Sequence, residues 1–175
     1  MRDSKGFTLI ELILVITIAA ILTGGSLMSL KYLSYANINK VTEKIDSSLT
    51  KLQMDTISKA YPFGYLAIEW DNTEQAYYMT MATSTTELTQ ANWSSAGKTI
   101  LSHKKIADKK ITITYVDLGE GSSKVTLRDT VPVLLISYKP DSGAFLSLCK
   151  QIDVTNESRS STIHMVNMTG NHYVD

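Results

Sequence analysis

A single acidic residue, Glu11, interrupts the most apolar part of the chain. Residues 7–22 are otherwise uncharged and almost wholly apolar, and the apolar character extends to Leu30. About twenty such residues are what a helix needs to cross a membrane. A carboxylate within that helix costs on the order of 2–3 kcal/mol. We therefore expect Glu11 to have a partner.

The remaining chemically capable side chains do not form a catalytic pattern. His103, His164 and His172 lack the spacing to a second histidine or cysteine that is typical of a metal site. We expect His164 to be half-buried and His172 to be solvated. Cys149 lies in the apolar run 144–149 and is predicted to be a buried small hydrophobe. No phosphate-binding loop, nucleophile elbow or dinucleotide fingerprint is found, so we expect no enzyme, metal or cofactor.

The best basic cluster is Lys104, Lys105, Lys109 and Lys110, which Asp108 interrupts. It has two interpretations: a loop that contacts DNA phosphates, or a solvated turn. Residues 61–175 hold ten Lys and Arg against twelve Asp and Glu, a net charge of −2. The whole chain has 17 of each and no net charge, so nothing global attracts it to nucleic acid.

Composition favours one globular domain with an appendage. The 175 residues are 43% hydrophobic and 19% charged, which is too apolar for a disordered chain. Arg2 and Lys5 precede the apolar run and predict a cytoplasmic N-terminus. That run could be a secretory signal peptide cleaved near residues 23–26, or a plain signal anchor. Both interpretations leave Glu11 unexplained.

A third interpretation accounts for Glu11. The segment Lys5-Gly6-Phe7-Thr8-Leu9-Ile10-Glu11 resembles the class III signal of type IV prepilins. The resemblance implies that a prepilin peptidase cuts between Gly6 and Phe7 and methylates the new Phe7 amine. It also implies that Glu11 is the glutamate that the family uses at the fifth mature position.

The charge of Glu11 fits this role. Cleavage creates a positive amine at Phe7, which can pair with a Glu11 carboxylate between neighbouring subunits. A buried ion pair is good at fixing register, because a mispaired subunit leaves a charge unmatched. The alternative is an acid that reaches the lipid headgroups near the start of the helix.

The apolar helix is predicted to continue to about Ala60 as an amphipathic helix. Its apolar residues recur at spacings of mostly three and four, which indicates one buried face. A short coiled coil is the alternative. Gly24-Gly25 is the weakest point, and the proline that major pilins carry nearby is replaced by Met28. The apolar positions of the continuing helix are Leu30, Leu33, Ile38, Val41, Ile45, Leu49, Leu52, Ile57 and Ala60.

After Pro62 the periodicity changes to two, which predicts a mainly antiparallel β head. Strands are expected at residues 65–70, 75–81, 110–116, 124–128, 133–138, 144–152 and 161–168, with a loop at residues 82–97. The turn Lys139–Gly143 and the ending Asn167–Asn171 resemble the GspH/FimT family of minor pilins and pseudopilins, whose heads are β-sandwiches. The basic residue that usually follows that family's Thr-Gly is absent here, where Asn171 stands.

The expected fold class is therefore α+β, with a long N-terminal helix, its first half transmembrane, packed on a sandwich-like head. The expected parts are a removed leader (1–6), a transmembrane and polymerisation helix (7–30), its amphipathic continuation (31–60) and the head (61–175).

The resemblance implies a minor pilin or pseudopilin of a type IV pilus, type II secretion system or competence pseudopilus. The alternative is a DNA-receptor minor pilin of natural transformation. The implied partners are the prepilin peptidase, other major and minor pilins, the membrane assembly platform and membrane lipid. The chain would cross the inner or cytoplasmic membrane once, with its head outside, and then enter a filament.

Overall fold

The computed structural model describes residues 8–58, 62–117, 123–128, 133–147, 149–157, 159–166 and 168–175, without the side chains of residues 24–35. The chain divides into two compact units, Met1–Ala36 and Asn37–Asp175. Helix α1, Leu9–Ser58, contributes to both units. We call the second unit the head; unlike the predicted head, 61–175, it includes α1 from Asn37 onward.

Helix α1 runs through the Gly24-Gly25 pair without a break. Within the head, its buried face consists of Ile38, Val41, Ile45, Leu49 and Leu52, all at most 4% exposed. Their spacing of three and four residues is the stripe that the sequence predicted. Ile57 departs from the prediction, since half of its surface is exposed. Leu30, Leu33 and Ala60 lie outside the described side chains.

Sheet A has four antiparallel strands in the order β3-β2-β1-β6. Strands β1 and β2 form a hairpin around a turn in which the Asp71 carboxylate accepts hydrogen bonds from two backbone N–H groups. The edge strand β3 carries two register shifts against β2. The strand bounds are β1 Phe63–Asp71, β2 Ala76–Ser84, β3 Thr99–Asp108 and β6 Val133–Tyr138.

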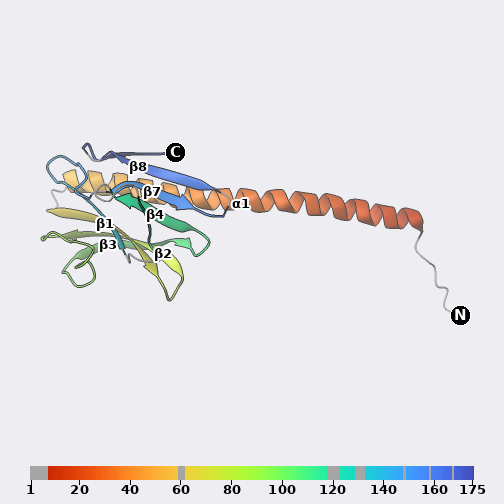
Figure 1. Cartoon of the computed structure of the whole chain (residues 1–175), viewed down its shortest axis with the longest axis horizontal. Coiled ribbons are helices and arrows are strands. Elements are labelled where there is room, and N and C mark those ends of the chain that lie inside the picture. Colours follow the sequence, from red (N-terminus) through yellow and green to blue (C-terminus); the bar gives the residue numbers. More distant parts are fainter. Residues whose placement is uncertain are drawn as a thin grey trace. The chain divides into compact units, whose positions relative to one another are not determined.

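Sheet B has five antiparallel strands in the order β5-β4-β7-β8-β9. Its bounds are β4 Thr112–Asp117, β5 Lys124–Thr126, β7 Cys149–Thr155, β8 Ser160–Val166 and β9 Asn171–Val174. Within the head, Figure 1 shows α1 between β1 of sheet A and β8 of sheet B. One hydrophobic core joins the inner faces of both sheets to the buried stripe of α1.

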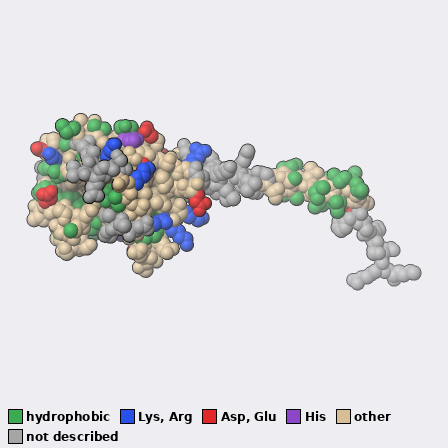
Figure 2. Space-filling view, in the orientation of Figure 1, with side chains coloured by type: hydrophobic (Ala, Val, Ile, Leu, Met, Phe, Trp, Pro, Cys, Tyr) green, Lys and Arg blue, Asp and Glu red, His purple; other side chains and the backbone are tan. Residues whose placement is uncertain are grey.

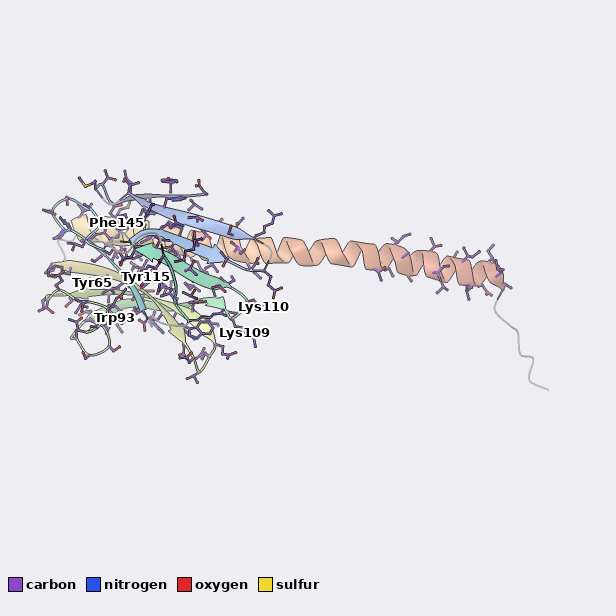
Figure 3. The ribbon with its side chains drawn as sticks, viewed as in Figure 1. Tyr65, Trp93, Lys109, Lys110, Tyr115 and Phe145 are labelled. Atoms are coloured by element: carbon purple, nitrogen blue, oxygen red, sulfur yellow. The ribbon has the colours of Figure 1, made fainter. Side chains whose placement is uncertain are left out.

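The outer face of sheet A is also covered. The loop predicted at 82–97 is confirmed for residues 85–97, while residues 82–84 belong to β2, and the segment 85–98 does not extend into solvent. Its Leu88 and Trp93 are 4% and 3% exposed and pack with Tyr65, Ala67 and other residues in a second apolar cluster. The Tyr65 hydroxyl accepts a 2.7 Å hydrogen bond from the Leu88 N–H. Tyr65 and Trp93 face each other at this side of the sheet (Figure 3).

The α+β class with an antiparallel, two-sheet head is confirmed, and several details differ from the prediction. The described residues form nine strands, because β3 and β9 were not expected. The strand expected at 144–152 begins only at Cys149, since Phe145 forms an isolated bridge with Tyr138.

His172 corrects a second expectation. It is not solvated: its side chain is 6% exposed, and its Nε2 lies 3.2 Å from Asp46 Oδ1 and 3.3 Å from Thr50 Oγ1 of α1. Strand β9 carries this ring on the side of sheet B that faces the helix, which is why it is buried. His164 is 29% exposed, so the expected half-buried ring is confirmed.

Candidate functional site

Glu11 closes the first turn of α1 together with Thr8. The Thr8 N–H and hydroxyl each donate a 2.9 Å hydrogen bond to Glu11 Oε2. In return, the Glu11 N–H donates to Thr8 Oγ1 over 3.4 Å. This reciprocal arrangement is a capping box, with Thr8 at the N-cap and Glu11 three residues later. Both side-chain bonds use Oε2, so Oε1 keeps its capacity to accept from another donor.

The helix that follows presents apolar side chains on all sides. The hydroxyl groups of Thr17 and Thr23 donate to backbone oxygens of the preceding turn, at 2.7 Å to Ile13 and 2.8 Å to Ala19. Their polarity is thereby satisfied within the helix. Figure 2 shows the resulting green surface. Ten large apolar residues are 48–77% exposed: Leu9, Ile10, Leu12, Ile13, Leu14, Val15, Ile16, Ile18, Ile21 and Leu22.

An apolar surface of this kind needs cover, because soluble monomers rarely expose large contiguous apolar patches. Among the described residues, no helix is long and apolar enough to cross a membrane. The predicted span, residues 7–30, begins and ends outside the residues whose side chains are described. Gly6 and Phe7, the predicted cleavage and methylation residues, likewise lie outside the described residues.

The four lysines of the basic cluster occupy two different elements. Lys104 and Lys105 are consecutive residues of β3, paired with Met79 and Tyr78, so they stand on opposite faces of sheet A. Lys105 also forms a 3.0 Å ion pair with Asp108. Only Lys109 and Lys110 lie in the turn after β3. The structure therefore does not bring the four lysines together on one loop.

The two turns that carried the subfamily resemblance meet at the C-terminal part of α1. Gly143 and Gly170 have φ values of 67° and 71°, which favour glycine. Gln53 Nε2 donates a 2.9 Å hydrogen bond to the Gly143 carbonyl. A Cβ added at Gly170 would lie 1.8 Å from that same carbonyl oxygen. Gly170 needs glycine because its backbone contacts that of Gly143, and Gly143 favours glycine because of its positive φ and because a Cβ there would lie 2.6 Å from the Ile57 side chain. We call the contact between the two backbones the glycine junction.

Other reactive groups of the head are held by its packing. Cys149 is 4% exposed, and burial, helped by the nearby Asp117, raises the pKa of its thiol to about 12. This confirms the expectation of a buried small side chain. Among the described residues, no three His, Cys, Asp or Glu side chains gather closely enough to hold a metal ion.

Among the described residues, Asp153 is a buried carboxylate that forms a network on the outer face of sheet B. It is 3% exposed and lies 2.7 Å from Lys124 Nζ. It also accepts hydrogen bonds from Thr162 at 2.8 Å and from Gln151 at 3.1 Å. Burial raises the pKa of this carboxyl, but the bonds from Lys124, Thr162 and Gln151 outweigh burial and bring its pKa below the ordinary value. This network stabilises the sheet and contains no catalytic pattern.

One comparison with known proteins bears on the N-terminal site. Residues 1–27 match the model of the prokaryotic N-terminal methylation motif. This motif supports a type IV pilin-like protein. It also supports a structural subunit rather than an enzyme, and processing by prepilin peptidase followed by assembly with other pilins. The search of curated proteins and the search of solved structures found no match.

Sequence reasoning placed Glu11 at the centre of this site but missed Thr8. The signal was present, because a threonine followed three residues later by glutamate, directly before an apolar run, is the capping-box pattern. Glu11 closes the helix terminus of its own chain, and its predicted pairing with a neighbouring subunit stays a prediction.

Proposed function

We propose that this chain is a minor pilin or pseudopilin, a membrane-anchored subunit that assembles into a type IV pilus, a type II secretion pseudopilus or a competence pseudopilus. The observation that carries the proposal is the methylation motif at residues 1–27, with the Gly6-Phe7 bond and Glu11 in the pattern of prepilins. The exposed apolar surface of residues 9–22 supports it, because lipid first and neighbouring helices later would cover that surface.

The capping box supports a specific mechanism for Glu11. Cleavage after Gly6 would leave the new amine one residue before Thr8, within about 4 Å of the Thr8 nitrogen by covalent geometry. Oε2 of Glu11 is held by Thr8, so its orientation is fixed before a neighbour arrives. In our proposal, the Phe7 amine of a neighbouring subunit binds the open Oε1. The pair then fixes the axial register of adjacent helices.

Two substitutions separate the charge of Glu11 from its capping role. Glutamine can close a capping box as glutamate does, but it carries no charge. Glu11→Gln therefore keeps the helix terminus and removes the ion pair, whereas Glu11→Ala removes both. We expect both variants to be cleaved and inserted, and both to be lost from sheared filaments on immunoblots. Glu43→Gln, which neutralises an exposed acid on the same helix, is the matched control and should assemble normally.

Mass spectrometry of the mature chain tests the processing step independently, since it should find N-methylphenylalanine at Phe7. Any other N-terminal residue would refute the prepilin assignment. Normal assembly of Glu11→Gln with loss of Glu11→Ala would show that Glu11 serves only as a cap. In that case the register mechanism is wrong, while the prepilin assignment stands.

The head gives the structural role more support than DNA reception. A DNA-binding surface gains affinity from each lysine that neutralises a phosphate. Here Lys104 and Lys105 stand on opposite faces of sheet A, and Lys105 is paired with Asp108. The net charge of −2 over residues 61–175 further weakens the attraction for a polyanion.

A further inference from the structure

A groove in the head lies between α1 and the turn that joins β3 to β4. Its cavity measures about 170 Å³. The charged side chains that line it are Lys40 and Lys44 of α1, and Asp108 and Lys110 of the turn. Its floor is apolar, formed in part by Val41 and Ile111, and its rim includes the Asn37 amide. The lining thus combines three ammonium groups with one carboxylate, an excess of two positive charges.

The three lysines of this groove form no ion pair with any described residue. Among the described residues, no carboxylate forms an ion pair with Lys40, Lys44 or Lys110, and the acid of the lining, Asp108, is bound to Lys105. Lys98 and Lys124, by contrast, are engaged with Trp93 and Asp153. Three unpaired ammonium groups around one concavity make a site for an anion, with phosphate as the natural match for their charge.

Hydrogen bonds from Arg128 hold the turn that carries Lys110. Arg128 donates from Nη2 to the carbonyl oxygens of Lys109 and Ile111, the residues on either side of Lys110. The Arg128 guanidinium also lies 4.3 Å from the centre of the Trp70 ring, which anchors it to β1. The Ile111 N–H closes the turn on the Asp108 carbonyl at 3.0 Å. Lys110 is therefore presented by a rigid backbone. Figure 3 shows Lys109 and Lys110 beside each other at one end of the head.

We propose that this groove, lined by Lys40, Lys44 and Lys110, binds the phosphate headgroup of an anionic phospholipid at the membrane surface. The inference rests on the proposed function, because it needs residues 7–30 in the bilayer. Asn37, at the rim of the groove, comes seven positions after Leu30, so the chain between these two residues spans at most about 25 Å. Each lysine near an anionic bilayer strengthens attraction by about 1 kcal/mol, which corresponds to roughly fivefold.

Nucleic acid is the competing polyanion, and the observations favour lipid. Before assembly, the membrane segment would tether the groove to the bilayer, whereas DNA would have to be captured from solution. A duplex also presents phosphates over a long track, and Lys104 and Lys105 stand on opposite faces of sheet A, so they do not together extend the groove along one face. The apolar floor suits the glycerol and upper acyl carbons of a lipid better than a second phosphate.

Lysine footprinting of the full chain in nanodiscs tests the proposal. The chain is placed in phosphatidylcholine alone or with added phosphatidylglycerol, acetylated briefly, and digested for mass spectrometry. We expect phosphatidylglycerol to slow acetylation of Lys40, Lys44 and Lys110 several-fold. Lys51, Lys139 and Lys150, which are exposed elsewhere on the head, should react at unchanged rates. Equal slowing of all six would indicate a general surface potential and overturn the site.

A triple variant provides the second arm. Lys40→Gln, Lys44→Gln and Lys110→Gln together should lose phosphatidylglycerol that the wild type retains in native mass spectrometry. The matched control, Lys51→Gln, Lys139→Gln and Lys150→Gln, changes the charge equally and should retain it. Retention by both variants refutes the proposal. Protection by inorganic phosphate or by duplex DNA, without protection by phosphatidylglycerol, also refutes it and identifies a free-phosphate or nucleic-acid site.

The experiments distinguish an error in the proposed lipid site from an error in the proposed function. A chain that does not enter any nanodisc contradicts membrane anchoring, and the lipid site with it. A chain that enters both kinds of nanodisc with unchanged lysine reactivity contradicts the groove alone. The assignment as a filament subunit, tested at Phe7, is unaffected by that second result.

Discussion

Replacing Gly170 with alanine is the sharpest test of how the head is closed. The added Cβ would lie 1.8 Å from the Gly143 carbonyl oxygen and 2.7 Å from Gln53 Nε2. Real Cβ atoms do not approach backbone so closely, so the two turns of the glycine junction must separate. The substitution also places an alanine at a φ of 71°, where an L-residue is strained.

The expected cost follows from these contacts. The left-handed backbone costs about 1–2 kcal/mol for a residue with a Cβ. Separating packed backbones costs about 1–3 kcal/mol, as overpacked sites do. Losing the Gln53 bond to Gly143 removes a further 0.5–1.5 kcal/mol, roughly the net value of one hydrogen bond. The free energy of unfolding should therefore fall by about 2.5–6.5 kcal/mol, a large part of the roughly 5–15 kcal/mol typical of a domain.

Tryptophan fluorescence provides the assay, because Trp70 and Trp93, the two tryptophans of the chain, both lie in the head. Thermal unfolding of the full chain in mild detergent should show a midpoint about 10 °C lower for Gly170→Ala. Gly97→Ala is the control, since its Cβ would meet nothing within 4 Å, and it should change stability by less than about 0.5 kcal/mol. A Gly170→Ala midpoint equal to that of Gly97→Ala would refute the close contact of the two turns.

Three further predictions concern the head. Asp153→Asn should destabilise it by about 1–3 kcal/mol at neutral pH. Because the pKa of Asp153 is lowered by folding, its stabilisation is complete above the unfolded pKa of about 4 and is lost as pH falls through the lower folded value, so the variant should show a shallower acid decline in unfolding experiments. Trp93→Phe removes the 2.6 Å hydrogen bond from Trp93 Nε1 to Glu69 and should release segment 85–98, which faster cleavage there by a nonspecific protease would reveal. Unchanged cleavage would mean that ring packing alone holds the segment. Cys149 should resist iodoacetamide at pH 8 in the folded chain and react after denaturation, while rapid labelling of the folded chain would contradict its burial.

Periodicity predicted most of the fold because most elements bury one face. Residues 133–138 were expected as a strand and form β6 with those bounds, and all six are buried. The stripe from Ile38 to Leu52 was visible for the same reason. Strand β3 was missed because it is an edge strand with two register shifts, so its exposed residues, including Lys104 and Lys105, do not alternate. Its polar side chains look like a loop.

The tertiary contacts of the candidate sites could not be predicted from local sequence patterns. Glu11 stood out because one charge in an apolar run needs an explanation, and the capping partner was three residues away. By contrast, Lys40 and Lys110 meet only because sheet A carries its β3–β4 turn beside α1. The burial of His172 depends on β9 docking next to Asp46. Neither contact can be predicted from residues that are close together in the sequence.

The contacts of β9 with α1 have a consequence for the time at which the head can form. Asp46 and His172 are separated by 126 positions in the chain. At a synthesis rate of about 5–20 residues per second, this side of the helix waits roughly 6–25 seconds for its partner. During that interval the amphipathic helix exists without the strand that covers it. The contacts of His172 with Asp46 and Thr50 can therefore form only after the final strand of the chain has been made.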